Sequence, residues 1–332
     1  MAERIRWGVL GNAMIARVCV IPAIQKSRNS TVHALATRSP EISTHNKILH
    51  IYESYEAVLE DPTIDVVYIP LPNHLHRSWT LRALRAGKHV LCEKPLACNA
   101  EEAQQMADAA ADAGLLLMEA FMYRFHPRTQ QIKQMVADGA IGTLCLVRSA
   151  FCYHMEEDLL ASGECARLDP EMGGGALLDV GCYSVSVTRW LLGAEPTQLQ
   201  GQAVYHPCGV DTHFVGLLRF PDNRLATLEA SFISALQQTY TVVGSAGAID
   251  LPHDAFIPWE KDTVFTVRGK DEEEGQQHVT PGVDEYQLMV EHFSDAVLGE
   301  TPLAFSPAES VRNMRVLDAL KEAAYTGKTV NL

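Results

Sequence analysis

Five alternations of strand-like and helix-like segments fill the chain up to about residue 120, and they constrain the fold more than any other feature. Each strand-like segment is a short apolar run, and Ile64–Ile69 is apolar almost without interruption. Such a run is typical of a strand that is covered on both faces. The alternation predicts a parallel, doubly wound sheet of the Rossmann type. The predicted strands are Ile5–Leu10, Thr31–Thr37, Ile64–Ile69, His89–Cys92 and Leu115–Met118.

Capping residues mark the helices between these strands. Asn99 is a good N-cap, and Glu102 stands at the third helical position, where its side chain can complete a capping box. Gly87 and Gly114 occupy the place just past a helix end that glycine favours. The predicted helices run up to about Ser27, over Ser54–Leu59, from about His76 to Ala86, and from Asn99 to Gly114.

Beyond about Pro127 the pattern changes, because strand-like runs follow one another with few helices between them. Turn residues such as Pro221 and Asn223 separate these runs. The succession predicts a mostly antiparallel open sheet with flanking helices. The predicted strands are Leu144–Tyr153, Gln198–Tyr205, His213–Phe220, Ala226–Phe232, Gln238–Gly244 and Asp262–Arg268, and the helices lie at about Arg128–Asp138 and Asp179–Leu192.

This change divides the chain of 332 residues into two predicted domains, residues 1–125 and 126–332. A capping box at Ser306–Glu309, with Pro307 at the first helical position, begins a last helix over about residues 306–326. We expect this helix to pack back toward the N-terminal domain. The acidic run Asp271–Glu274 is expected to be a solvated loop between strands.

Charge and composition exclude several classes of protein. Lys and Arg number 27 against 41 Asp and Glu, and the net charge of −14 would be repelled by nucleic acid and by an anionic membrane surface. Apolar residues make up 47% of the chain and charged residues 20%, as in soluble globular proteins. The eight cysteines form no C-x-x-C pair and are expected to be reduced thiols. With neither a signal peptide at its start nor an apolar stretch of about 18 residues, the chain is expected to be soluble and cytoplasmic.

A glycine-rich turn joins the first predicted strand to the first helix. Gly11, Ala13 and Ala16 fill the three places of the dinucleotide fingerprint, which need a tight turn, a small residue at the pyrophosphate and a small residue for helix packing. Alanine at the second place departs from the usual glycine, since its methyl group faces the phosphates. The position of the turn, at the start of a βαβ series, favours dinucleotide binding over a plain glycine turn. The candidate cofactor contacts here are Gly11, Asn12, Ala13, Met14 and Ile15.

The end of the second predicted strand indicates which dinucleotide binds. An NAD enzyme normally places Asp or Glu there to bind the ribose hydroxyls, whereas this chain has Thr37 and Arg38. An arginine suits a 2′-phosphate, and the threonine hydroxyl can add a hydrogen bond. The alternative is a surface arginine in a loop. We predict NADP as the cofactor and consider NAD less favoured.

Four further motifs follow in a fixed order along the chain. They are Leu71–His76, Glu93–Pro95, Glu119–Pro127, and Gly173–Gly175 followed by Asp179–Tyr183. This set resembles the glucose–fructose oxidoreductase and inositol dehydrogenase (Gfo/Idh/MocA) family over nearly the whole chain, and Glu-Lys-Pro is its most specific piece. The chain is most similar to the branch of dihydrodiol dehydrogenases, xylose dehydrogenases and NADP-dependent sugar ketoreductases, which have a similar Leu-Pro-Asn-x-x-His and Asp-x-Gly-x-Tyr.

The resemblance implies three catalytic residues. Lys94 matches the family's catalytic lysine, and it stands at the carboxyl end of a parallel strand, where open α/β sheets bind ligands. Tyr183 matches the residue proposed as acid or base in this branch. A neighbouring ammonium lowers the pKa of a phenol, so Lys94 and Tyr183 would work as a unit if the fold brings them together. Asp179, one helical turn before Tyr183, would orient the substrate or the lysine, or would simply be a helix-start carboxylate.

Other matches to the family are candidate cofactor contacts. Arg167 would reach the cofactor or the rim of the site, and His74 is expected to face solvent and serve no function. The remaining candidates are Leu71, Pro72, Asn73, His76, Glu93, Lys94 and Arg124.

A metal site is the weaker alternative reading of two short motifs. Cys152, His154 and Glu156 would share one face of a strand, and His206 and Cys208 lie close in sequence. No fourth ligand stands at a recognisable spacing, so we predict no metal.

The resemblance implies an NADP-dependent oxidoreductase that moves hydride between nicotinamide and a secondary alcohol or ketone. The small polyol-like substrate would be a sugar, a sugar derivative or a trans-dihydrodiol, bound by the second domain. The open sheet of that domain would join two copies in a homodimer or higher homo-oligomer. Two alternatives are a non-catalytic NADP(H)-sensing regulator on the same fold and a nicotinamide-dependent glycosidase. Intact Lys94 and Tyr183 argue against the sensor, which needs neither residue.

Overall fold

A computed structural model describes residues 4–38 and 48–332 of the chain. The chain separates into two compact units, and each is described by itself. Unit 1 contains Met1–Phe125 and Asp284–Val311, and unit 2 contains His126–Val283 and Arg312–Leu332. The predicted second domain, residues 126–332, therefore includes a segment, 284–311, that belongs to unit 1.

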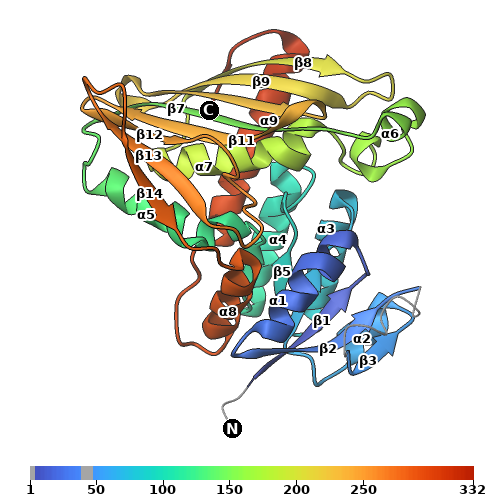
Figure 1. Cartoon of the computed structure of the whole chain (residues 1–332). Coiled ribbons are helices and arrows are strands. Elements are labelled where there is room, and N and C mark those ends of the chain that lie inside the picture. Colours follow the sequence, from blue (N-terminus) through green and yellow to red (C-terminus); the bar gives the residue numbers. More distant parts are fainter. Residues whose placement is uncertain (1–3, 39–47) are drawn as a thin grey trace. The chain divides into compact units, whose positions relative to one another are not determined.

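The centre of unit 1 is a six-stranded sheet in the order β3-β2-β1-β4-β5-β6 (Figure 1). Every pair of neighbouring strands in it is parallel, which confirms the predicted Rossmann-type sheet. The edge strand β3 was not predicted, and its residue His50 pairs with Ala34 of β2. The strands are β1 (Ile5–Leu10), β2 (Ser30–Ala36), β3 (His50–Tyr52), β4 (Val66–Ile69), β5 (His89–Cys92) and β6 (Leu117–Glu119).

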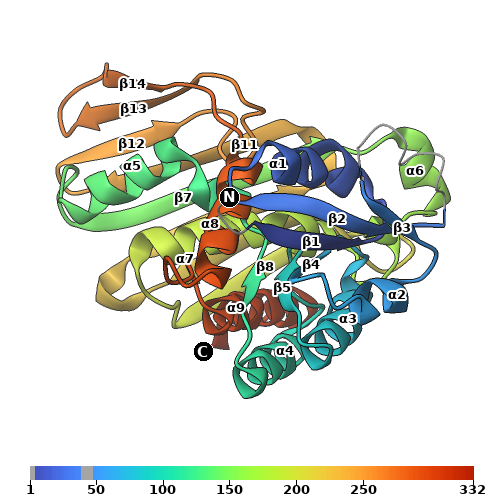
Figure 2. The same cartoon turned by 90° about the horizontal axis from the view of Figure 1, so that it is seen from below.

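Helices cover both faces of this sheet, with α1 and α8 on one face and α2, α3 and α4 on the other (Figure 2). Side chains of β1 point alternately to the two layers. Trp7 packs against Phe293 of α8, whereas a Cβ at Gly8 would meet Val58 of α2. The helical segments are η1 (Ala16–Val20, a π-helix), α1 (Ile21–Lys26), α2 (Tyr55–Glu60), α3 (Asn73–Arg85), α4 (Ala100–Ala113), the 3₁₀ turn η3 (Met122–Phe125) and α8 (Glu285–Val297).

The predicted caps are present at the ends of these helices. The Asn99 side chain accepts a hydrogen bond from the Glu102 amide at 2.9 Å, and Gly114 adopts φ 64° at the end of α4. Helix α3 begins at Asn73, directly after Pro72, and so includes the residues from Asn73 to His76 of the motif that was predicted to precede it. The motif residues after Pro72 are therefore held on a helix.

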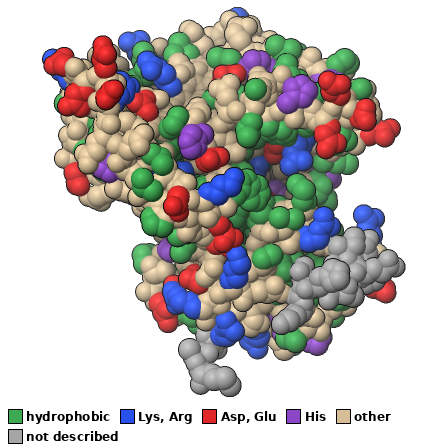
Figure 3. Space-filling model, in the orientation of Figure 1, with side chains coloured by type: hydrophobic (Ala, Val, Ile, Leu, Met, Phe, Trp, Pro, Cys, Tyr) green, Lys and Arg blue, Asp and Glu red, His purple; other side chains and the backbone are tan. Residues whose placement is uncertain are grey.

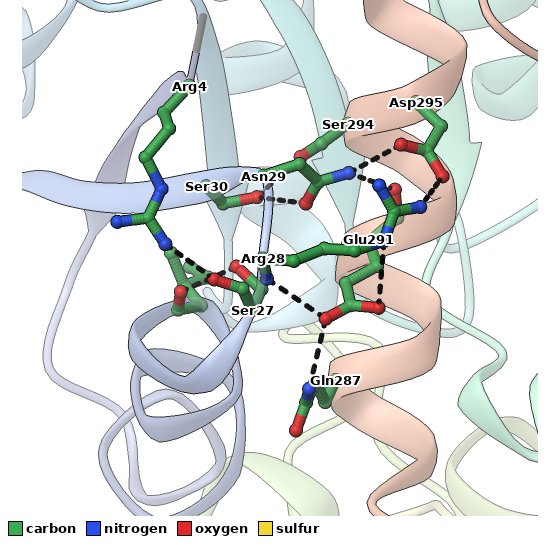
Figure 4. Close-up of polar contacts among 10 residues, drawn as sticks. Arg4, Ser27, Arg28, Asn29, Ser30, Gln287, Glu291, Ser294 and Asp295 are labelled. Atoms are coloured by element: carbon green, nitrogen blue, oxygen red, sulfur yellow. Dashed lines mark hydrogen bonds and ion pairs between the residues drawn. The ribbon is translucent and has the colours of Figure 1, made fainter. Parts of the chain in front are cut away.

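Helix α8 docks on the junction between α1 and β2, although the predicted second domain included it. The Asn29 side-chain amide donates to the Glu291 carbonyl at 2.8 Å and to Asp295 Oδ1 at 2.7 Å, and Arg28 forms an ion pair with Asp295 (Figure 4). The Trp7 indole N–H donates to Ser294 Oγ at 3.2 Å inside the core. Buried hydrogen bonds therefore join two segments that lie far apart in the sequence.

The second sheet has nine strands in the order β14-β13-β12-β11-β7-β10-β9-β8-β15. All pairs are antiparallel except β10 with β7, which confirms a mostly antiparallel sheet. Strands β12, β14 and β15 were not predicted, and Asp271–Glu274 lies exposed between β13 and β14 as expected. The strands are β7 (Leu144–His154), β8 (Gln198–Tyr205), β9 (Asp211–Arg219), β10 (Leu225–Ser231), β11 (Ile233–Gly244), β12 (Gly247–Leu251), β13 (Thr263–Gly269), β14 (Gln276–Thr280) and β15 (Val330–Asn331).

Helices lie along one face of this sheet, and the described elements place no helix over its other face (Figure 1). On the covered face, a Cβ at Gly216 would lie 3.1 Å from Leu320 of α9. Helix α9 is divided between the units, with Pro307–Val311 in unit 1 and the residues from Arg312 onward in unit 2. The open face exposes Val204, Val215 and Leu217. The helical segments are α5 (Pro127–Ala137), α6 (Glu157–Ser162), η4 (Ala166–Leu168), η5 (Leu177–Gly181, a π-helix), α7 (Cys182–Leu192), η6 (Pro221–Asn223) and α9 (Pro307–Thr326).

Acidic and basic side chains are interspersed over the face in view in Figure 3. No helix within residues 4–38 and 48–332 has the length and apolar character needed to cross a membrane.

Candidate active site and cofactor-binding residues

The loop after β1 has the geometry of a phosphate-binding turn. Gly11 has φ +100°, and a Cβ there would come within 3.2 Å of Leu71 Cδ2, so the turn requires glycine. The Gly11 amide donates to the Ala36 carbonyl at 3.0 Å, and helical structure begins at Met14. Asn12 Nδ2 is buried and has no acceptor within the described part of the chain. A tight turn, a helix start and an available amide donor fit a dinucleotide pyrophosphate.

A surface pocket of about 460 Å³ lies at the end of β2. Its described lining consists of Thr37, Arg38, Ile51 and Glu53. The Thr37 amide donates to the Tyr52 carbonyl at 2.9 Å, which holds the ends of β2 and β3 side by side. The predicted pair Thr37 and Arg38 therefore lines one pocket with a carboxylate from the next strand. Arg38 and Glu53 form no ion pair with each other in the described structure.

The turn that carries Lys94 is fixed by hydrogen bonds on both sides. Tyr68 donates to Glu93 Oε1 at 2.6 Å, and the Leu96 amide donates to Glu119 Oε1 at 2.9 Å. All residues of Leu91–Ala97 are buried except Lys94, which is partly exposed. The sequence thus places one ammonium group at the carboxyl edge of a parallel sheet, on a backbone that cannot easily move.

His76 joins two loops at the same edge of the sheet. Its Nε2 lies 2.7 Å from the Leu71 carbonyl, and its Nδ1 lies 3.0 Å from the Pro95 carbonyl. The side chain is completely buried, and this burial lowers its pKa to about 4. His76 therefore contacts the backbone of the Lys94 turn as a neutral imidazole, and its predicted role as a cofactor contact stays a prediction.

The other candidates of unit 1 lie in different surroundings. Leu71 is buried under the glycine turn, and Pro72 and Asn73 are partly buried at the start of α3. Arg124 is buried, forms an ion pair of 2.5 Å with Glu309 and lies 4.3 Å from the Phe305 ring. These contacts within unit 1 give Arg124 a structural role, and its cofactor contact remains untested.

His74 differs from its expected solvent-facing position. Its side chain is partly buried, and Nδ1 is a buried atom with no hydrogen-bond partner among the described residues. The cause is the earlier start of α3, which places His74 in the first turn of the helix.

In unit 2 the predicted residues Asp179 and Arg167 meet. Arg167 Nε donates to Asp179 Oδ2 at 2.9 Å, and the hydroxyl of Tyr153 on β7 donates to the same oxygen at 3.2 Å. The neighbouring carboxylate raises the pKa of Arg167, which stays charged. Burial, followed by the charge of Asp179, raises the pKa of Tyr153, which stays a neutral donor. The cluster therefore holds one carboxylate between a charged donor and a neutral donor.

The glycine cluster positions this carboxylate. The Gly175 amide donates to the Arg167 carbonyl at 2.9 Å, and the Asp179 amide donates to the Gly175 carbonyl at 3.0 Å. Gly175 has φ +113°, and a Cβ there would lie 2.3 Å from Asp211 Oδ1, so only glycine fits. Asp211 in turn accepts from the Leu177 amide at 2.7 Å. The backbone of Arg167 and the start of the Asp179 turn are thus tied together.

Tyr183 lies at the start of α7 among aromatic rings. Its ring centroid is 5.3 Å from those of Phe151 and Phe256, and the side chain is 3% exposed. The Phe256 loop is anchored by Arg128, whose guanidinium donates to the Asp254 carbonyl at 2.9 Å and to the Ala255 carbonyl at 2.7 Å. These contacts fix the ring of Tyr183 in an apolar setting.

The helical segment that carries Asp179 and Tyr183 is not a regular α-helix. Residues Leu177–Gly181 form a π-helical turn, and the α-helix begins at Cys182. The expectation that Asp179 and Tyr183 share one face was argued from 3.6 residues per turn, and this segment departs from that geometry. π-Helical turns of this kind often occur at functional sites.

The alternative metal reading gains no support from the geometry. His206 Nδ1 lies 2.8 Å from Cys208 Sγ, and Nε2 lies 2.8 Å from the Leu160 carbonyl. Among the described residues, no three His, Cys, Asp or Glu side chains are grouped in a way that could hold a metal ion.

Two residues of these clusters were absent from the sequence predictions. Tyr153 lies on a predicted strand, and alternation along that strand could have placed it opposite Cys152 and His154, but not beside Asp179. Glu53 follows the unpredicted strand β3, so no sequence signal linked it to Arg38.

Comparison with known proteins gives matches across both units. Residues 5–121 match the oxidoreductase family with an NAD-binding Rossmann fold, and residues 129–250 match the GFO/IDH/MocA C-terminal domain. The chain is 38% identical to D-xylose 1-dehydrogenase (NADP(+)) 2 of Haloferax volcanii, over 98% of this chain and 99% of that protein. It is 32% identical to trans-1,2-dihydrobenzene-1,2-diol dehydrogenase of Xenopus tropicalis, over 83% of this chain and 82% of that one.

A solved structure also covers nearly the whole fold. The 3-ketoreductase of Actinomadura kijaniata, in complex with NADP and TDP-benzene, superimposes with a TM-score of 0.88 at 30% identity, over 97% of this chain and 98% of that chain. The predicted family resemblance is confirmed by these matches. The chain belongs to the Gfo/Idh/MocA family of oxidoreductases with an NAD-binding Rossmann fold.

Proposed function

We propose that this protein is an NADP-dependent oxidoreductase that transfers hydride between nicotinamide and a secondary alcohol or ketone. The substrate class is a sugar, a sugar derivative or a trans-dihydrodiol. The observation that carries the proposal is the hydrogen-bonded turn at the carboxyl edge of the cofactor sheet. Within Leu91–Ala97 every residue is buried except Lys94, which is partly exposed. The relatives support the substrate class, since their names include a xylose dehydrogenase and a dihydrodiol dehydrogenase.

The preference for NADP rests on the pocket at the end of β2. Arg38 offers a guanidinium and Thr37 a hydroxyl, which together suit a 2′-phosphate. The xylose dehydrogenase relative is named for NADP, and the ketoreductase structure contains it. The glycine turn with Asn12 would hold the pyrophosphate. When bound, NADP supplies a nicotinamide carbon that accepts or donates hydride.

Three residues act on the substrate in this proposal. The Lys94 ammonium donates a hydrogen bond to the reacting oxygen and stabilises negative charge on it. Tyr183 takes the hydroxyl proton in oxidation and returns it in reduction. Asp179, held between Arg167 and Tyr153, accepts a hydrogen bond from a substrate hydroxyl and orients the sugar or diol. Lys94 lies in the cofactor-binding unit, and Tyr183 and Asp179 lie in the unit that we assign to the substrate.

Two further features belong to the proposal. The open face of the nine-stranded sheet, with Val204, Val215 and Leu217 exposed, would be covered by a second copy of the chain in a homodimer. A reduced cytoplasmic location agrees with eight free cysteines, four of which are buried.

A substitution series tests the chemistry. Lys94→Ala is expected to lower turnover by about 10³-fold or more with little change in NADP affinity. The reason is that it removes both the ammonium that stabilises negative charge on the reacting oxygen and the positive charge that would lower the pKa of Tyr183. Tyr183→Phe keeps the ring between Phe151 and Phe256 and is expected to lower turnover by roughly 10²–10⁴-fold. The double variant is expected to be barely worse than Lys94→Ala, since groups that act as a unit are not additive.

The assay is nicotinamide absorbance with a panel of aldoses, ketoses and dihydrodiols. Losses that multiply in the double variant would show that the two residues serve separate steps. Near-normal turnover of Tyr183→Phe would refute its assignment as the acid, and His154 or Asp179 would then be tested. Tight NADP binding by the wild type without turnover of any substrate would favour a sensor instead.

A further inference from the structure

Tyr153 is a polar side chain of the substrate unit that no sequence motif assigned. It lies on β7, in the central part of the nine-stranded sheet, and its ring packs 5.3 Å from Phe232. Its hydroxyl donates to Asp179 Oδ2 at 3.2 Å, and Arg167 Nε donates to the same oxygen at 2.9 Å. The two donors approach the carboxylate from different elements, β7 and the turn at Ala166–Leu168.

The two donors restrict the carboxylate in different ways. The Arg167 side chain is 52% exposed and long, so alone it would hold Asp179 weakly. The phenol of Tyr153 is carried by a strand and packs at a tilt against the Phe232 ring, and it has only two side-chain torsions to order. Tyr153 is therefore the rigid member of the cluster, and Arg167 supplies the compensating charge.

A carboxylate has about four acceptor sites, so it can accept from a substrate hydroxyl as well as from protein donors. The direction from which that hydroxyl can approach depends on the orientation of the carboxylate plane, which Tyr153 and Arg167 both restrict. A sugar or a diol presents hydroxyl groups that can donate to such a carboxylate.

We propose that Tyr153 is a positioning residue that orients the Asp179 carboxylate to accept a hydrogen bond from a hydroxyl of the substrate. This inference rests on the proposed function, and it adds a residue to it. Tyr153 does not transfer the proton, because its hydroxyl is already donated to Asp179.

The experiment measures steady-state kinetics of the full-length enzyme with NADP and D-xylose, or with whichever vicinal diol of the panel the wild type oxidises best. Tyr153→Phe keeps the ring on Phe232 and removes only the hydroxyl. We expect KM for the diol to rise about tenfold while kcat changes less than threefold, which is the effect of one lost hydrogen bond. The Kd of NADP, measured by fluorescence titration, should not change.

A double-substitution cycle separates positioning from a merely structural role. If Tyr153 acts through Asp179, Tyr153→Phe should have no further effect in an Asp179→Ala background. Tyr240→Phe is the control for loss of a phenol hydroxyl, since it removes another buried one, without a hydrogen-bond partner among the described residues, from the neighbouring strand β11. It should leave KM unchanged.

The outcomes are distinguishable. A wild type that oxidises the diol, combined with a Tyr153→Phe variant of unchanged KM, would overturn this inference and leave the proposed function standing. Losses that multiply across the cycle, or a collapse of kcat with constant KM, would also overturn it. A wild type that turns over no sugar and no diol would overturn the proposed function and the inference together.

Discussion

Acid should destabilise the protein through His76, and the structure gives the size of the effect. The imidazole is completely buried between the Leu71 and Pro95 carbonyls, and burial lowers its pKa from 6.5 to about 4. Below pH 6.5 the unfolded chain takes up a proton at this residue and the folded chain does not. Folding is therefore penalised progressively between pH 6.5 and 4. Above pH 6.5 both states are neutral at His76 and the penalty is absent.

The magnitude follows from the difference between the two pKa values. A difference of about 2.5 units corresponds to about 3 kcal/mol of unfolding free energy, of which about 2.5 kcal/mol is lost by pH 4.5. That is a large part of the 5–15 kcal/mol typical of a folded domain, by order of magnitude. His76→Gln removes the titrating group and should flatten the dependence by this amount, although it lowers stability at neutral pH.

Urea unfolding followed by far-UV circular dichroism at several pH values between 4.5 and 7.5 measures the effect. The difference between the wild type and His76→Gln isolates His76 from all other groups. Parallel curves for the wild type and His76→Gln would refute the reasoning, since His76 would then titrate alike in both states.

Three further outcomes are expected. Arg38→Ala should weaken NADP by roughly 10- to 100-fold and leave NAD nearly unchanged, because it removes a charge-assisted bond made only to the 2′-phosphate; equal losses in fluorescence titrations would contradict this. Glu53→Gln, in the same pocket, should raise the preference for NADP over NAD by about threefold or more, because it removes a negative charge near the phosphate, and an unchanged ratio of kcat/KM values would show that Glu53 plays no part. Val215→Glu, on the exposed face of β9, should convert a homodimer to monomers in sedimentation at micromolar concentration, whereas a wild type that is already monomeric would remove the dimer proposal.

The main strands of the first sheet could be predicted because buried strands consist largely of apolar residues. Val66–Ile69 is buried at every position, and a short uninterrupted apolar run is typical of a strand that is covered on both faces. Strand β3 could not be found in the same way, since His50 and Ile51 are exposed and only the pairing with β2 makes them a strand. The parallel pairing of β10 with β7 joins distant segments and leaves no local signal either.

Helix α8 shows a signal that was present and not used. Asp284 caps it by accepting from the Gln287 amide at 3.0 Å, and Tyr286, Met289 and Phe293 form its buried face at helical spacing. The spacing of these residues predicts a buried helix face but does not show which of the two sheets that face packs against. The domain boundary predicted at residue 126 therefore missed the return of the chain to unit 1.

The candidate site divides in the same way. Lys94 and Tyr183 were identified from motifs, because their residue types and neighbours are distinctive. The hydrogen bond from Tyr153 to Asp179 depends on how β7 lies against the π-helical turn Leu177–Gly181, which no spacing rule predicts. Sequence patterns thus name the reactive groups, whereas the residues that orient them emerge only from packing.

The docking of α8 on β1 also decides when the cofactor unit can fold during synthesis on the ribosome. Trp7 is translated well before its partners Phe293 and Ser294, which follow the whole of residues 126–283. Until then the part of the sheet face that α8 covers stays open to water or to a chaperone. A nascent or truncated chain that ends at Phe125 therefore keeps an exposed tryptophan, and the cofactor unit is completed only once residues 284–311 have been made.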